Sequence, residues 1–214
     1  TGQSLSPELK QVKPPFVEQM RTHITTSHVV SGWFDEIPMW TFLWIWMAWE
    51  QYTLNGDQAA LETYYADVRE CLRRCESFLS PRGLLDIPEV WNLVDWAAQD
   101  LERDGEVIAN TVLMAQSLDC AAHMAEALGR SQEAETQRTL AGRLRAAVNR
   151  YGWSDEYQGY VDTVRDETGY QTFRSRREAA GIPVESYAEY LQKIRISEPT
   201  NTLAMLCRCV PPER

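Results

Sequence analysis

One short stretch of the sequence carries residue types that recognise a sugar or another ring-shaped small molecule. Residues 91–96 read Trp-Asn-Leu-Val-Asp-Trp, so that two indole rings flank the carboxylate of Asp95. Aromatic rings pack on the apolar C–H face of a sugar, and carboxylates accept hydrogen bonds from its hydroxyl groups. We therefore interpret Trp91, Asp95 and Trp96 as candidate binding residues. The alternative is that both tryptophans plug the core and Asp95 caps a helix.

A second aromatic and acidic group precedes the first long apolar segment. Trp33, Asp35 and Glu36 end a loop that leads directly into Pro38. The topology argued below places this loop on the same side as Trp91, so we expect these three residues to contribute to the same site. Asp162 ends a predicted hairpin; it is interpreted as a residue that closes a turn, with a position facing the site as the alternative.

The sequence contains no pattern of a nucleophilic, metal-dependent or nucleotide-dependent enzyme. His28 and His123 lack a Gly-x-Ser-x-Gly motif or a comparable cysteine context, and no glycine-rich phosphate loop is present. Cys71 and Cys75 lie one helical turn apart with no histidine nearby, so we interpret the five cysteines as small buried side chains in a reducing compartment. We expect no metal and no cofactor, and no catalytic residue can be assigned.

Composition narrows the class of partner. The chain has 214 residues and a formal net charge of −10, which disfavours nucleic acid and an anionic membrane surface. Its N-terminus shows no apolar stretch of the signal-peptide type, so the expected location is cytoplasmic. The expected partner is a small molecule.

The elements that must position these residues are helical. Residues 37–55 form a long apolar pattern with Pro38 in the first turn and Gly56 as its stop. Because apolar residues surround it on nearly all sides, we predict a central helix buried all round, including Trp44 and Met47. Asp57 is a plausible N-cap for a second, amphipathic helix.

Helical hairpins account for the rest of the pattern. Short turns alternate with long irregular loops, which is typical of a solenoid or toroid of hairpins with its function on the long-loop side. Residues 1–28 are interpreted as a lead-in with one short helix, and residues 29–214 as one all-α domain with a single β-hairpin. The further predicted elements are helices at 107–128, from a Ser131 cap onward and from Pro183 onward, a hairpin at 153–162, an Arg- and Glu-rich segment ending at Gly181, and a short run at 200–210.

Several short motifs follow one another in a fixed order from about residue 29 to the C-terminus. They are Ile37-Pro-Met-Trp-Thr-Phe-Leu-Trp, Asn55-Gly-Asp57, Gly83-Leu-Leu, Trp91-Asn-Leu-Val-Asp-Trp96, Leu128-Gly129, Trp153-Ser-Asp-Glu, Gly159-Tyr-Val-Asp162, Thr200-Asn-Thr-Leu-Ala and Val210-Pro-Pro-Glu213. This ordered set resembles the six-hairpin domain of bacterial and fungal α-L-rhamnosidases. The resemblance implies an (α/α)6 toroid whose loops form the sugar site, with Trp91, Asp95 and Trp96 lining the rhamnose pocket.

The resemblance also implies an inverting hydrolysis that uses two carboxyl groups. In that family the general acid lies upstream of the matched part and the general base lies downstream of it. We therefore expect an incomplete domain, about half a toroid, without the acid and base segments. The first hypothesis is an α-L-rhamnosidase-like glycoside hydrolase domain that is a fragment or remnant.

Two hypotheses of other classes stay open. The same scaffold can serve a non-hydrolytic enzyme that binds an apolar metabolite, such as a cyclase or isomerase of secondary metabolism. It can also be a non-catalytic assembly fragment. An open half-toroid exposes apolar helix faces, so we expect a homo-oligomer in every case.

Overall fold

The computed structural model describes residues 37–88, 90–96 and 105–212, and these ranges are mostly helical with one short antiparallel hairpin. The all-α prediction is therefore confirmed. The helices are α3 (Pro38–Asn55), α4 (Gln58–Glu76), α5 (Ile108–Ala127), α6 (Ser131–Ala147), α7 (Glu167–Ala179), α8 (Tyr187–Leu191) and α9 (Glu198–Leu206), and a π-helical turn, η1 (Val148–Gly152), extends α6 into strands β1 (Trp153–Ser154) and β2 (Gly159–Tyr160).

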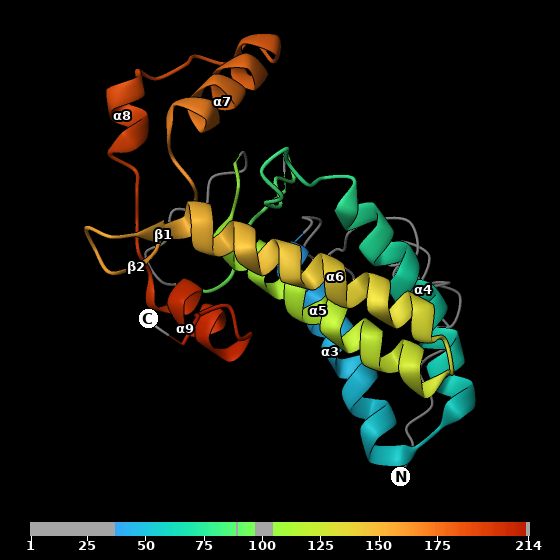
Figure 1. Cartoon of the computed structure of the whole chain (residues 1–214). Coiled ribbons are helices and arrows are strands. Elements are labelled where there is room, and N and C mark those ends of the chain that lie inside the picture. The colour runs from blue at the N-terminus through green and yellow to red at the C-terminus, as the bar shows by residue number, and fades with distance from the viewer. Residues whose placement is uncertain (1–36, 89, 97–104, 213–214) are drawn as a thin grey trace.

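Two helical hairpins, α3–α4 and α5–α6, form the body of the molecule (Figure 1). Their short turns lie at one end. The described parts of the long connections, residues 77–88, 90–96, 105–107 and 148–197, lie at the other. Gly56 ends α3 with a φ of 66°, a left-handed conformation that glycine adopts without a steric penalty. Asp57 then caps α4 by accepting hydrogen bonds from the backbone N–H groups of Ala59 and Ala60. The predicted order of short turns and long loops is confirmed.

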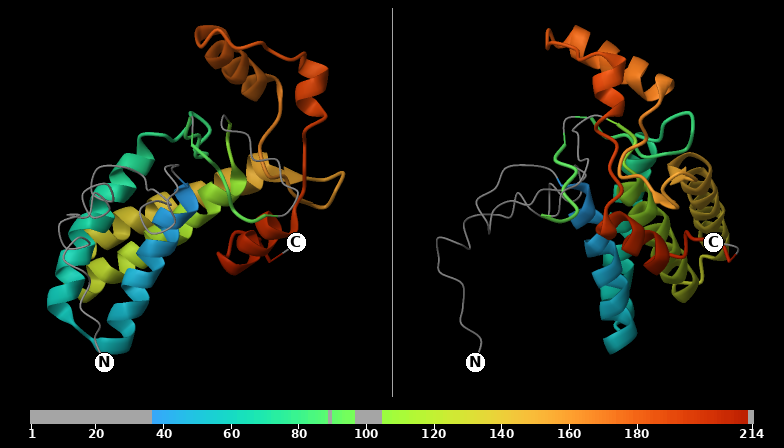
Figure 2. Two further views of the ribbon diagram at one scale, coloured as in Figure 1. Left: turned by 180° about the vertical axis from the view of Figure 1, so that it is seen from behind. Right: turned by 90° about the vertical axis from the view of Figure 1, so that its left-hand side faces the viewer.

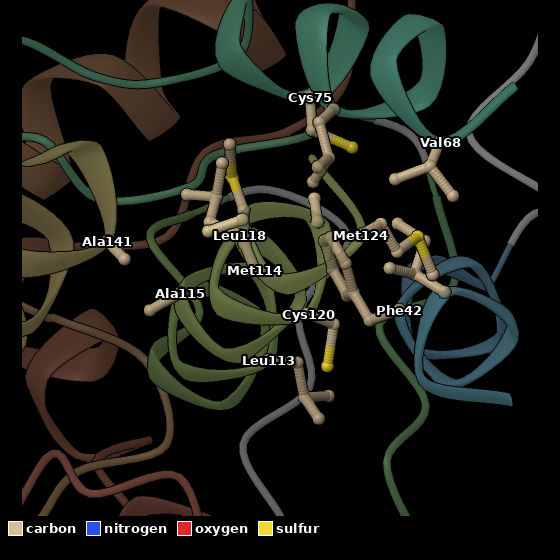
Figure 3. Packing of buried hydrophobic residues seen from close by; sticks show 14 of the residues in the cluster. Phe42, Val68, Cys75, Leu113, Met114, Ala115, Leu118, Cys120, Met124 and Ala141 are labelled. Carbon is tan, nitrogen blue, oxygen red and sulfur yellow. The ribbon is translucent and has the colours of Figure 1, made fainter. Parts of the chain in front are cut away.

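Helix α5, and not α3, lies at the centre of the fold. It packs against α3, α4, α6 and α9, and most of its residues are buried (Figure 3). Alanine and serine at many of its positions allow the neighbouring helices to approach closely, while Leu113, Met114 and Leu118 fill the space between them. The aromatic density of α3 suggested a centre there, but small side chains mark the most enclosed helix.

The prediction that α3 is buried all round is wrong. Phe42, Ile45 and Ala48 face α5 and α4, whereas Met47 is 66% exposed and Trp44 is only partly buried. Trp40 and Leu54 are exposed as well. The physical reason is that α3 stands at the edge of the described helices and packs on one side. The expected self-association through such a face stays a prediction.

Two helix starts also differ from prediction. Helix α8 begins at Tyr187 because Ser186 forms a capping box with Glu189, in which each side chain bonds the other residue's backbone N–H; Pro183 lies in the extended segment before it. Ser131 is the first residue of α6 and not its cap, since Arg130 occupies the N-cap position. Both corrections shift a boundary and leave the order of elements unchanged.

The predicted hairpin is present, with Trp153 opposite Tyr160 and Ser154 opposite Gly159. Its turn contains Gln158 at a φ of 54°. Among the described residues, no helix combines the length and the hydropathy that a membrane span requires. The described part of the chain consists of the two helical hairpins, the β-hairpin, α9, and a separate segment that contains α7 and α8.

The two faces of α3 give a matched stability test. We expect Phe42→Ala to lower the free energy of unfolding by about 3–5 kcal/mol, because it opens a cavity in the core. Met47→Ala, on the exposed face of the same helix, should change it by less than about 0.5 kcal/mol. Urea denaturation followed by circular dichroism measures both. Equal losses would contradict the edge position of α3.

Candidate functional site

The two tryptophans of the 91–96 stretch meet in the structure. Their ring centroids lie 5.7 Å apart with an interplanar angle of 75°, an edge-to-face pair. Trp91 is half-buried, while Trp96 is 74% exposed. Asp95 is exposed, and its Oδ1 accepts a hydrogen bond from the backbone N–H of Trp96 at 2.7 Å. The sequence-predicted trio is therefore assembled at the molecular surface.

The loop that carries the trio is fastened to the first turn of α5. Asn110 Nδ2 donates to Asn92 Oδ1 at 2.8 Å, and both residues are buried. Val90 and Leu93 are buried beside them. Burial of a polar pair in this geometry fixes the loop, because leaving either amide unpaired would be costly. The inward-facing residues hold the backbone while Asp95 turns outward.

The start of the same connection is also tied to α5. Leu79 and Leu85 form an isolated antiparallel bridge, and the backbone N–H of Leu85 donates to Thr111 Oγ1 at 2.9 Å. Thr111 in turn donates to the carbonyl of Val107 at 3.1 Å. The connection therefore meets α5 at two successive positions, 110 and 111. Neither anchor was identified from the sequence, where Asn and Thr inside a helix gave no distinguishing signal.

Asp162 lies in the core, at the starts of α5 and α9. Its backbone carbonyl accepts from Ile108 N at 2.9 Å, at the start of α5. Its fully buried carboxylate accepts from Ser197 Oγ at 2.5 Å and from Thr200 Oγ1 at 2.6 Å, at the start of α9. The same aspartate thus binds the N-termini of two core helices. The sequence analysis expected a residue that closes a turn, whereas Asp162 joins the starts of two helices.

A network of charged side chains joins the α4–α5 connection to the start of α7 and to α7 itself, and it was missed in the sequence analysis. The guanidinium of Arg82 pairs with both carboxylate oxygens of Glu106 and with Asp166 Oδ2 at 2.5 Å. Asp86 Oδ1 accepts from Arg176 Nη1 at 2.8 Å. Burial opposes ionisation of Asp166, but hydrogen bonds from Gly169 N and Arg82 outweigh it and lower the pKa of this carboxyl. These residues lie 24 to 90 positions apart, so no local motif revealed them.

The other candidate residues, Trp33, Asp35 and Glu36, lie outside the described residues. The cysteines are free and buried, as predicted for their burial. Burial raises the pKa of Cys207 to about 12 and that of Cys209 to about 11, so their thiols are protonated near neutral pH. Within the described ranges, His, Cys, Asp and Glu form no group of three or more suited to a metal ion.

The arrangement can bind a ring and donate or accept hydrogen bonds at its edge. Trp91 and Trp96 offer apolar surface in two perpendicular planes, and Asp95 places a carboxylate next to them. By contrast, Glu106, Asp166 and Asp86 are already engaged by arginines. The geometry therefore favours recognition of a neutral ring over proton transfer by a pair of carboxyl groups.

Comparisons with known proteins agree with this architecture. The model of the bacterial alpha-L-rhamnosidase 6 hairpin glycosidase domain matches residues 15–172. The crystal structure of a GH78 family rhamnosidase of Bacillus sp. GL1 superposes with a TM-score of 0.70 at 25% identity, over 89% of this chain and 18% of that chain. A rhamnosidase from Klebsiella oxytoca with rhamnose bound shares the fold, with a TM-score of 0.54 at 15% identity over 80% of this chain and 35% of that one.

The chain thus spans about a fifth of the length of the Bacillus protein and about a third of that of the Klebsiella protein. A search of curated proteins found no match.

Asp162 gives the stability test of this region. We expect Asp162→Ala to lower the free energy of unfolding by at least about 3 kcal/mol, because each hydrogen bond to a charged group contributes about 1.5–3 kcal/mol. Asp155→Ala, at the exposed turn of the β-hairpin, is the matched control and should cost less than about 1 kcal/mol. Thermal and urea denaturation compare the two. A loss at Asp162 no larger than that at Asp155 would show that this carboxylate does not hold α5 and α9 together.

Proposed function

Because the chain belongs to the bacterial α-L-rhamnosidase six-hairpin glycosidase domain family, we propose that it forms a sugar-binding part of a rhamnosidase-type glycoside hydrolase domain. The ligand proposed is an α-L-rhamnoside. The match to a rhamnosidase fold over most of the chain supports this proposal. The finer claim, binding of the sugar by named residues, rests on the geometry of the 91–96 loop.

The observation that carries the proposal is the edge-to-face pair of Trp91 and Trp96. Trp91 is half-buried and Trp96 is mostly exposed, so the pair presents apolar surface in two nearly perpendicular planes to solvent. A deoxysugar has an apolar face that fits an indole ring, and its remaining hydroxyl groups can bond to Asp95. An exposed tryptophan on a loop anchored by buried side chains is a typical recognition surface.

We further propose that these 214 residues bind the sugar without hydrolysing it. Inverting hydrolysis needs a protonated carboxyl at the leaving oxygen and an ionised one across the ring, about 6.5–9.5 Å apart. Around the described loop, Asp86, Glu106 and Asp166 are paired with arginines and Asp162 is buried. Asp95 has the exposure that a substrate contact needs, but an acid and a base must act from opposite faces of the sugar.

Binding is tested by truncating the tryptophans. Trp91→Ala and Trp96→Ala should each weaken binding of methyl α-L-rhamnopyranoside by about 1–3 kcal/mol, the free energy of burying a large apolar side chain. Both variants should fold, because the residues sit in a loop. Trp40→Ala, also partly exposed but on α3, is the matched control and should leave affinity unchanged. Calorimetric titration measures the affinities, and equal binding by all three variants would refute the assignment.

Activity is tested with p-nitrophenyl α-L-rhamnoside. We expect no useful release of nitrophenol by the purified 214-residue chain, because loss of a general acid or base costs roughly 10²–10⁴ in rate. Binding by tryptophans stabilises the ground state as much as the transition state and cannot restore that rate. Turnover near one per second that Asp95→Asn or Asp35→Asn abolishes would mean that these residues are catalytic.

A further inference from the structure

A second hollow lies between the long α4–α5 connection and helix α7. Its volume is about 380 Å³, and Trp91, Asp95 and Trp96 are not among the residues that line it. Both figures of the whole chain show α7 and α8 standing away from the helical hairpins (Figure 2). The cavity separates this excursion from the body at the point where the two approach each other.

One wall of the cavity is a single face of α7. Gly169, Thr172, Phe173 and Arg176 line it, and their spacing of three and four residues places them on one side of the helix. In a packed helix such a face meets another element directly. Here Phe173 is buried, while Thr172 lies exposed at the rim. Phe173 also packs against Tyr190 of α8, with ring centroids 5.2 Å apart, so this face of α7 borders both the cavity and α8.

The charges around the cavity are fixed and balanced. Two arginines and two carboxylates line it, and they form the pairs Arg82–Glu106 and Arg176–Asp86. Arg82 is further held by Asp166 and by the ring of Tyr151, whose centroid lies 5.4 Å from its guanidinium carbon. A lining with no net charge disfavours an ion of either sign as ligand. Because these contacts hold the side chains in place, they lose little conformational entropy when they form hydrogen bonds to a ligand.

The carboxylate of Asp86 has one oxygen that can accept a further hydrogen bond. Its side chain is 9% exposed, and both of its hydrogen bonds, from Arg176 Nη1 at 2.8 Å and from Gly105 N at 3.2 Å, fall on Oδ1. Within the described part of the chain, Oδ2 accepts from no group. A carboxylate oxygen can accept more than one hydrogen bond, and the donors to Asp86 both use Oδ1. Oδ2 is therefore a natural acceptor for a hydroxyl group of a bound molecule.

We propose that this cavity binds one neutral sugar ring, at a site separate from the Trp91–Trp96 pair. Its volume lies within the range of about 300–1,000 Å³ of small-molecule sites. The side chains of Phe78 and Pro88 offer apolar surface to one side of the ring. Asp86 Oδ2 accepts one hydroxyl proton, and the second chain segment that contacts the sugar is α7. The site does not depend on the activity proposed above.

Two matched substitutions on α7 test the site. Thr172→Trp places an indole at the rim of the cavity, whereas Ser175→Trp places the same group at an exposed position of the same helix that does not line it. Both are introduced into the Trp96→Ala chain, so that the tryptophan pair does not contribute. The probes are methyl α-L-rhamnopyranoside and methyl α-D-glucopyranoside, and binding is followed by ligand-observed NMR and calorimetry. Circular dichroism checks that each variant is folded.

We expect the Trp96→Ala chain to bind at least one probe, Thr172→Trp to weaken that binding at least ten-fold, and Ser175→Trp to leave it unchanged. Asp86→Asn, which removes the charge of the spare acceptor, should weaken it too and serves if Thr172→Trp does not fold. Absence of binding by the Trp96→Ala chain, or binding that neither Thr172→Trp nor Asp86→Asn alters, would overturn the proposal. Binding lost in Thr172→Trp but unaffected by Trp96→Ala would support this site and count against the tryptophan pair.

Discussion

The described structure depends on one buried carboxylate. Asp162 connects the first turn of α5, through its backbone carbonyl, with the first turn of α9, through its side chain. The N-terminus of a helix carries a partial positive charge, so the start of α9 stabilises this carboxylate, while the start of α5 is held through the backbone carbonyl. Because α5 is the centre of the packing, this interaction also sets where the 77–107 connection can be attached.

The 91–96 loop is therefore held in place by residues of the core. Asn110 and Thr111, in the turn of α5 that follows Asp162's contact, bind the connection at Asn92 and Leu85. The loop that carries the tryptophan pair is thus held by hydrogen bonds between buried groups. Buried polar side chains hold the irregular backbone of the loop in one conformation, and the aromatic rings of the loop face outward.

Local patterns predicted what local interactions decide. Gly56, Asp57 and the amphipathic spacing of α4 depend on neighbours within a few residues, and the hairpins and their order were predicted from such patterns. The binding role of the Trp91–Trp96 stretch stays a prediction. Tertiary contacts decided the rest. Whether α3 or α5 is enclosed depends on which neighbours each helix meets, so aromatic density misassigned the centre. The ion pairs of Arg82 and Arg176 join residues far apart in the chain and have no sequence signature.

The excursion of residues 165–194 leaves and rejoins the body at almost one point. Val164 N bonds to Glu106 O as the chain departs, and Arg195 O accepts from Asp162 N as it returns. A segment whose ends are pinned together by the body adds little closure entropy, and its cost rises only with the logarithm of its length. Closure entropy therefore places little constraint on the length of the segment that contains α7 and α8. The excursion is the part of the molecule where new surface can evolve at the lowest cost to the core.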